Sequence, residues 1–181
     1  AGQRIFGENK IQEMTDKWEA LPKDIQWHMI GHVQTNKVKY MAPYVNLIHS
    51  ADRLKLFKEI NKEAKKNERV IDVLLQVKIA EEDSKFGMPP EEAKAFLEEN
   101  KAAQYPNVNI IGLMGMASFV DDEVQIKREF AQLAKIYNTF KEQYAFSVLS
   151  MGMSGDYKLA LEHGSTMVRV GSAIFGARNY N

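Results

Sequence analysis

Short apolar runs alternate with amphipathic stretches along the whole 181-residue chain, and this alternation limits the possible folds more than any other feature. The stretches between the runs carry apolar residues at helical spacing, for example Leu54, Phe57 and Ile60, and Asp52 is the expected N-cap of that helix. A repeated strand–helix–strand order places parallel strands in one sheet, so the predicted fold class is α/β. The seven predicted strands cover residues 4–7, 27–31, 45–49, 70–79, 108–116, 146–150 and 167–170.

The number of predicted strands favours a barrel. Seven strands with helical crossovers are one short of the TIM-type (β/α)8 barrel. We therefore expect a single domain over residues 1–181, an N-terminally incomplete barrel whose first strand lies upstream of Ala1. A doubly wound parallel sheet is the alternative, because it shows the same alternation of strands and helices.

The strand predicted at 70–79 indicates which of its sides faces the helices. Its odd-numbered positions are all apolar, whereas the even-numbered positions include Asp72, Gln76 and Lys78. In a barrel the apolar side meets the helices and the mixed side points into the lumen, toward the mouth where barrel active sites lie. An edge strand of an open sheet, with one side in water, is the alternative.

Composition excludes several classes of protein. Lys plus Arg and Asp plus Glu are 24 each, so the chain lacks the basic excess usual in nucleic-acid-binding proteins. Cysteine is absent, which excludes disulfides and thiolate chemistry. No stretch approaches the roughly 20 apolar residues of a membrane span. The four histidines show neither HxH nor HExxH spacing, so no metal site is expected.

Two Gly-rich segments follow the last two predicted strands and are suited to bind an anion. Residues 150–156 read Ser-Met-Gly-Met-Ser-Gly-Asp, and residues 169–176 read Arg-Val-Gly-Ser-Ala-Ile-Phe-Gly. Glycine lets the backbone approach a ligand closely, and free N–H groups at the start of a helix attract phosphate. The loops after strands seven and eight are a frequent phosphate site of TIM barrels. A plain Gly-rich turn is the alternative for either segment alone, and the pair favours phosphate.

Arg169 and His28 lie on predicted strands. Arg169 stands between two valines, so it points into the lumen if both valines face the helices. A buried arginine stays charged and needs a partner, which is either an acceptor on a bound ligand or a carboxylate of the barrel. His28 either lines the lumen or packs as a structural histidine.

Five motifs occur in a fixed order over the whole chain. They are Phe6-Gly7-Glu8-Asn9, Trp27-His28-Met29-Ile30-Gly31-His32-Val33-Gln34-Thr35-Asn36-Lys37, Ser84-Lys85-Phe86-Gly87, Leu149-Ser150-Met151-Gly152-Met153-Ser154 and Met167-Val168-Arg169-Val170-Gly171-Ser172-Ala173-Ile174-Phe175-Gly176. In combination they resemble the pyridoxal phosphate homeostasis proteins, which are related in fold to the barrel domain of alanine racemase. The resemblance implies a barrel of the alanine racemase type that holds pyridoxal 5′-phosphate at its mouth.

The resemblance also implies roles for particular residues. The phosphate would be held by Ser154, Gly171 and Ser172, and Arg169 would face the pyridine nitrogen. Further expected cofactor-binding residues are Asn9, His28, Met114 and Lys85, the last near the ring hydroxyl. Family members hold the cofactor as a Schiff base to a lysine on the first strand, in a segment like Val-Ser-Lys. We expect that lysine upstream of Ala1, because no such segment occurs here.

The function implied by the resemblance is to hold and buffer the cofactor in intracellular vitamin B6 homeostasis, without established catalysis. A permanent cation at the pyridine nitrogen disfavours protonation of the ring, and an unprotonated ring is a poorer electron sink. The alternatives are a racemase- or decarboxylase-like enzyme on the same barrel and a barrel enzyme acting on another phosphorylated metabolite. The implied protein is cytoplasmic, a monomer or weak dimer, binds neither nucleic acid nor membrane, and has pyridoxal-phosphate-dependent apoenzymes as partners.

Overall fold

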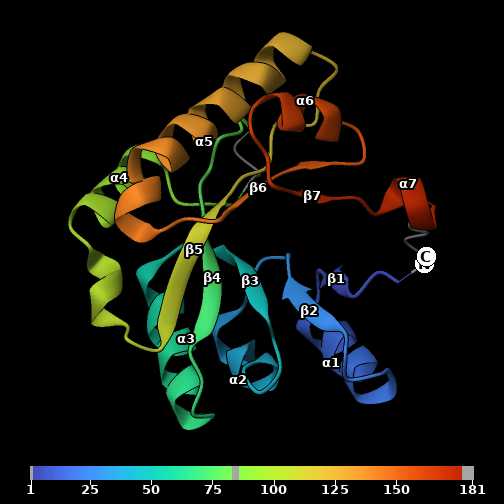
Figure 1. Ribbon diagram of the computed structural model, residues 1–181, viewed down its shortest axis with the longest axis vertical. Coiled ribbons are helices and arrows are strands. Elements are labelled where there is room, and N and C mark those ends of the chain that lie inside the picture. The colour runs from blue at the N-terminus through green and yellow to red at the C-terminus, as the bar shows by residue number, and fades with distance from the viewer. Residues whose placement is uncertain (1, 83–85, 177–181) are drawn as a thin grey trace.

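The computed structural model describes residues 2–82 and 86–176, which contain seven parallel strands in one sheet (Figure 1). The strands are β1 (Ile5–Glu8), β2 (Gln26–Met29), β3 (Leu47–Ala51), β4 (Ile71–Gln76), β5 (Val108–Met114), β6 (Val148–Met153) and β7 (Met167–Arg169). The α-helices are α1 (Ile11–Ala20), α2 (Val38–Met41), α3 (Leu54–Lys66), α4 (Pro90–Glu98), α5 (Glu123–Tyr144), α6 (Tyr157–Glu162) and α7 (Ser172–Phe175). Two 3-10 turns, η1 (Thr35–Lys37) and η2 (Lys101–Gln104), complete the described elements.

The sheet is curled into a barrel. Its strands follow one another in the order β1 to β7, without the reversal of order that defines a doubly wound sheet. His49 on β3 lies 3.0 Å from the hydroxyl of Ser150 on β6, although β4 and β5 stand between them in the sheet. In a flat sheet three strand spacings would separate these strands by roughly 14 Å. The barrel prediction is therefore confirmed, and β1 and β7 are its two edges, unpaired with each other in the described residues.

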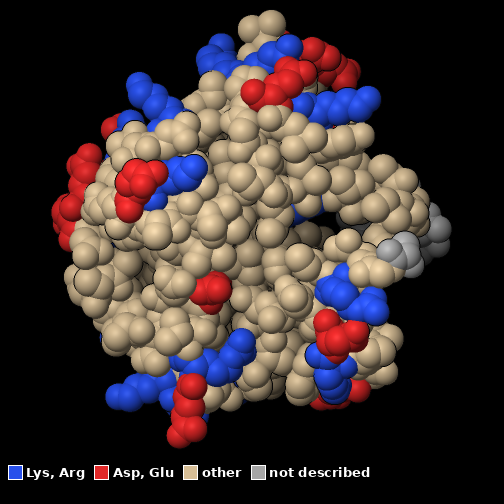
Figure 2. All heavy atoms as spheres, viewed as in Figure 1, with Lys and Arg blue, Asp and Glu red and all other residues tan. Residues whose placement is uncertain are grey.

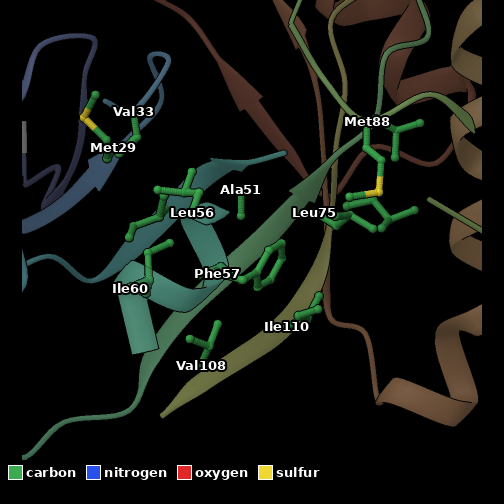
Figure 3. Packing of buried hydrophobic residues seen from close by; sticks show 14 of the residues in the cluster. Met29, Val33, Ala51, Leu56, Phe57, Ile60, Leu75, Met88, Val108 and Ile110 are labelled. Carbon is green, nitrogen blue, oxygen red and sulfur yellow. The ribbon is translucent and has the colours of Figure 1, made fainter. Parts of the chain in front are cut away.

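The main hydrophobic core lies between the outer side of the sheet and the helices. Figure 3 shows Leu56, Phe57 and Ile60 of α3 gathered near β4 and β5, where Val108 and Ile110 lie. The odd-numbered residues from Ile71 to Ile79 belong to this core, as the alternation along that strand predicts. Amphipathic helices thus cover the outer side because their apolar faces and the apolar side of each strand are buried against each other.

A second, smaller cluster fills the lumen. Leu47, Leu74 and Met114 are buried there, on β3, β4 and β5. Partly buried residues packed against them are Ile111, Met116, Val148 and Met167. The lumen is therefore packed with side chains, as in other barrels of this kind, and is not an open pore.

Two local predictions are wrong in detail. The fourth strand ends at Gln76 instead of Ile79, because Lys78 N–H donates to Met88 O and Val77 forms an isolated bridge with Met88, so the chain turns toward α4. Asp52 does not cap α3, since its carboxylate lies against Arg53 and 3.4 Å from His32. Propensity for a cap does not reveal that a nearby cation competes for the carboxylate.

Candidate functional site

Six strands place a side chain in the upper lumen, which is the part of the lumen between the middle of the strands and their carboxyl ends. These residues are His28, His49, Gln76, Met114, Ser150 and Arg169, from β2 to β7 in that order. On β3 to β7 they share the parity of residues of the lumen cluster, and the neighbours of His28 on β2 belong to the outer core. The carboxyl end of a parallel barrel is the place where such folds bind ligands.

Four of these side chains form a continuous chain of hydrogen bonds across the lumen. His28 Nδ1 lies 3.0 Å from His49 Nε2, and His49 Nδ1 lies 3.0 Å from Ser150 Oγ. Arg169 Nη1 donates to the same Ser150 hydroxyl over 2.5 Å. The chain joins β2, β3, β6 and β7, so it exists only because the sheet is curled.

Burial controls the charge of both histidines. His28 and His49 are 6% and 1% exposed. Burial lowers the pKa of His28 to about 4. For His49, burial is again the main cause of a lowered pKa, and the nearby charge of Arg169 lowers it further. Both imidazoles are therefore neutral at pH 7.

Arg169 is the cation of the lumen. Its second nitrogen, Nη2, donates to Gly115 O over 3.1 Å, so both bonds of its guanidinium go to neutral oxygens. Burial lowers its pKa to about 10, and the charge of Asp156 opposes this shift, so the side chain is still positive at neutral pH. No carboxylate forms an ion pair with it in the described residues. A partly buried cation that has no carboxylate in an ion pair with it is suited to face an acceptor on a ligand.

The two Gly-rich loops meet at the mouth. Ser154 Oγ, just after β6, accepts hydrogen bonds from Gly171 N at 3.2 Å and Ala173 N at 3.3 Å, just after β7. The loop after β6 depends on Gly152, whose φ of +96° and close approach to Tyr157 exclude a side chain. By contrast, a Cβ at Gly155 or Gly171 would meet nothing within 4 Å. The loops thus present a hydroxyl and two backbone donors beside free space.

The structure brings most of the predicted site residues together. Ser154, Gly171 and Ser172 lie in the meeting loops, and Arg169, His28 and Met114 lie in the lumen. Asn9 is exposed after β1 and lines a cleft of about 340 Å³ with Lys10, His32 and Lys37, to which the four hydrogen-bonded lumen residues do not contribute. Lys85 lies outside the described residues. The roles of these residues toward a cofactor stay predictions.

Sequence analysis missed His49 and Ser150 as lumen residues. His49 shares the parity of Leu47 in the run 45–49, but the other side of that run carries Asn46, so neither side is wholly apolar and the reasoning applied to residues 70–79 does not decide. Gln76 was predicted on the mixed side of its strand, but its hydrogen bond was not predicted. In that bond Gln76 Nε2 donates to Phe86 O at 3.0 Å. Its amide thereby anchors the segment that leads into α4.

The surface of the molecule is consistent with a ligand site near β7. Figure 2 shows a hollow on the right of the view, between the region of β7 and α7 and the region of β1 and β2 in Figure 1. Across residues 2–82 and 86–176, no three His, Asp or Glu side chains gather in a way that would hold a metal ion. Within the same residues, no helix has the length and apolar character needed to span a bilayer.

Comparison with known proteins identifies similar sequences over the full chain. The family model of the alanine racemase N-terminal domain matches residues 1–179. The pyridoxal phosphate homeostasis protein of Aquifex aeolicus is 42% identical over 182 residues, which cover 99% of this chain and 79% of the relative. The protein of the same name from Escherichia coli is 36% identical and is covered to the same 79%.

Solved structures show the same architecture. PipY of Synechococcus elongatus without pyridoxal phosphate superposes with a TM-score of 0.89 at 34% identity, covering 97% of this chain and 83% of that one. The same protein with pyridoxal phosphate bound gives a TM-score of 0.83 at 32% identity, covering 97% and 82%. An alanine racemase of Clostridium difficile, at 11% identity and a TM-score of 0.75, covers 98% of this chain and 46% of the enzyme, which shows a shared fold alone.

Proposed function

We propose that this chain binds pyridoxal 5′-phosphate at the barrel mouth and holds it without turning over a substrate, because it belongs to the alanine racemase N-terminal domain family and within it to the pyridoxal phosphate homeostasis proteins. The observation that carries the proposal is the meeting of the two Gly-rich loops next to an arginine that lacks an anionic partner in the described residues. The ligand thus needs both a phosphate and an acceptor on its ring.

The phosphate would be held by Ser154, Gly171 and Ser172. The hydrogen bonds from Gly171 N and Ala173 N to Ser154 Oγ are long, and both residues are exposed, Gly171 just before α7 and Ala173 in its first turn. A phosphate oxygen is a stronger acceptor than a serine hydroxyl, because it is charged. On binding, these backbone donors would turn to the phosphate and Ser154 would donate its own proton to it.

The ring would lie in the upper lumen, with its nitrogen facing Arg169 and with Met114 and His28 beside it. Bound pyridoxal phosphate supplies an aldehyde that takes up amines and a pyridine ring that draws electrons when its nitrogen is protonated. Ser150 and Gly115 hold Arg169 by its two Nη atoms, so the cation is fixed in place. A fixed cation disfavours protonation of the ring nitrogen, which favours storage of the cofactor over carbanion chemistry.

A storage role has consequences for partners and location. A protein that holds a cofactor without using it must exchange it with proteins that do, so we infer pyridoxal-phosphate-dependent apoenzymes as recipients. Such apoenzymes place this chain in the cytoplasm. A monomer or weak dimer suits this role, since each barrel supplies all the residues named above.

Equilibrium dialysis with pyridoxal phosphate tests the phosphate site. Ser154→Ala removes one donor to a charged group, and we expect the dissociation constant to rise about tenfold or more. Ser147→Ala is the matched control, because Ser147 is exposed just before the opposite end of β6. Inorganic phosphate should compete in the wild type and compete less well in Ser154→Ala. Equal affinity of both variants and the wild type for pyridoxal phosphate would overturn the phosphate site.

Hydrogen exchange at the Cα of L-alanine tests the absence of turnover. The loaded protein is incubated with L-alanine in D2O, and deuterium at Cα is followed by NMR. We expect no more exchange than free pyridoxal phosphate produces, because Arg169 keeps the ring nitrogen unprotonated. An alanine racemase is the positive control. Exchange at a rate near that of the control would favour the racemase-like alternative.

A further inference from the structure

The hydrogen-bond chain across the lumen has a direction that its chemistry determines. Arginine only donates, so Ser150 Oγ must accept from Arg169. Each neutral imidazole carries one proton on its ring nitrogens, so the nitrogen that carries it determines the direction of each histidine hydrogen bond. Two arrangements are possible, and they run in opposite directions.

In the first arrangement every hydrogen bond points away from Arg169. The Ser150 hydroxyl donates to His49 Nδ1, and His49 Nε2–H donates to His28 Nδ1. The proton of His28 is then on Nε2. Each group accepts on the side of the cation and donates on the far side, so all three dipoles stabilise the positive charge and polarise one another.

In the second arrangement both histidines carry their protons on Nδ1. His49 would then donate to a Ser150 oxygen that already accepts from Arg169, and two N–H dipoles would point their positive ends toward the cation. The Ser150 proton would also need another acceptor, and Ser150 Oγ has no further hydrogen-bond partner among the described residues. Buried, unpaired donors are costly, so this arrangement is less stable.

We propose that Arg169, acting through Ser150 and His49, holds His28 in the tautomer that carries its proton on Nε2, so that β2 presents a hydrogen-bond donor to the ring of the bound ligand. Buried polar side-chain atoms left without a partner in the described residues are Glu8 Oε2 and Trp27 Nε1, and His28 Nε2 is not one of them. No described residue bonds to His28 Nε2 either. This nitrogen therefore remains accessible to a ligand.

The acceptor on the ligand is the oxygen of the hydroxyl group attached to its ring. The phosphate loops follow β6 and β7, and Arg169 ends β7, whereas His28 is on β2. In pyridoxal phosphate this hydroxyl group is attached to the edge of the ring opposite to the carbon that carries the phosphate arm. This last step rests on the proposed function, but the tautomer of His28 is a property of the chain alone. His49 and Ser150 are positioning residues in this arrangement, because they act through His28.

NMR of the protein with ¹⁵N-labelled histidine tests the tautomer without any ligand. Protonated and unprotonated ring nitrogens of a neutral histidine differ strongly in chemical shift, so long-range ¹H–¹⁵N spectra assign each proton. At pH 7 we expect His28 and His49 each to be a single species with the proton on Nε2. A proton on Nδ1 of His28, or comparable populations of both tautomers, would overturn the proposal.

Two variants test whether Arg169 sets the tautomer. Ser150→Ala removes the link, and Arg169→Met removes the cation, so in both we expect His28 to populate both tautomers. Ser147→Ala should leave the spectrum unchanged. A merely structural role of these residues would change stability but not tautomer populations. If His28 keeps its Nε2 proton in both variants while both remain folded, the relay does not exist.

Addition of pyridoxal phosphate tests the donor role separately. We expect the His28 Nε2 resonance to shift with pyridoxal phosphate and to shift much less with an analogue that lacks the ring hydroxyl. His28→Leu should bind about tenfold more weakly, and His28→Gln, which keeps a donor, should bind nearly as well as the wild type. If neither compound binds, the proposed function fails while the tautomer result stands. If both bind and His28 Nε2 does not respond, the donor role is wrong.

Discussion

The lumen histidines are buried next to a cation instead of a carboxylate, and this controls how the protein responds to acid. The unfolded chain takes up protons on these residues near pH 6.5, but burial lowers the pKa of His28 to about 4 and that of His49 well below its usual value. Between these values the unfolded state binds more protons than the folded state. The free energy of unfolding therefore falls as the pH falls through this range.

We expect His28 alone to remove about 2 kcal/mol of stability between pH 7 and pH 5. Urea denaturation at several pH values measures this slope. His28→Gln should flatten the slope, because glutamine does not titrate. His163→Gln is the control, since His163 Nδ1 donates to Leu159 O on α6, outside the lumen network. A wild-type stability that is constant from pH 7 to pH 5 would contradict the expectation.

At the residue scale, sequence patterns predicted some lumen side chains and not the contacts between them. Two flanking valines were enough to predict that Arg169 faces the lumen, because side chains alternate along a strand. The same rule does not assign His49, because its neighbours are Ile48 and the polar Ser50. The bond from His49 to Ser150 joins residues 101 positions apart, and no local pattern specifies it. The size and curl of the sheet determine such pairs.

At the element scale, the close approach of β5 and β6 depends on one residue without a side chain. A Cβ at Gly112 would lie 1.7 Å from the backbone oxygen of Val148, its partner in the parallel register. Backbone of a central strand pair has little freedom to move, because each strand is also hydrogen-bonded on its other side. Gly112 therefore allows these strands to pair at all.

Gly112→Ala should destabilise the protein by about 3 kcal/mol or more, since the added methyl group overpacks a buried strand pair. Gly155→Ala is the matched control, because Gly155 is exposed and a Cβ there meets nothing within 4 Å. We expect its effect to stay within about 0.5 kcal/mol. Thermal unfolding of both variants measures the difference. Equal melting temperatures would show that β5 and β6 can separate at little cost.

Element types followed from apolar periodicity, and element ends did not. The apolar faces of residues 54–64 and 71–79 predicted a helix and a strand that pack against each other, although Leu54 is exposed and Leu56 is buried in its place. The fourth strand nevertheless ends early, because Met88, eleven residues on from Val77, pairs with its last residues. Tertiary contacts of this kind override the local preference of an apolar run. The lower reliability of boundaries thus has a physical cause.

At the scale of the whole molecule, the candidate site draws on strands near both edges of the sheet. Arg169 lies on the edge strand β7, Ser154 follows β6, and His28 lies on β2, next to the edge strand β1. β1 and β7 are each paired on one side only in the described residues. Strands with one neighbour open more easily than central strands, because fewer hydrogen bonds and less packing must be lost. Stability should therefore be graded across the sheet, and the phosphate loops lie at its less stable end.

Amide hydrogen exchange followed by NMR tests this gradient. We expect the slowest exchange in β4 and β5 and the fastest in β1 and β7, because local opening begins where pairing is one-sided. Pyridoxal phosphate should then slow exchange at Gly171 and Ala173, whose amides turn from the Ser154 hydroxyl to a charged acceptor. Amides of α3, on the far side of the molecule from α7 in Figure 1, serve as the control and should not respond. Uniform protection across all seven strands would show that the edges are as stable as the centre. Unchanged exchange rates at Gly171 and Ala173 on addition of the cofactor would show that its phosphate does not bind there.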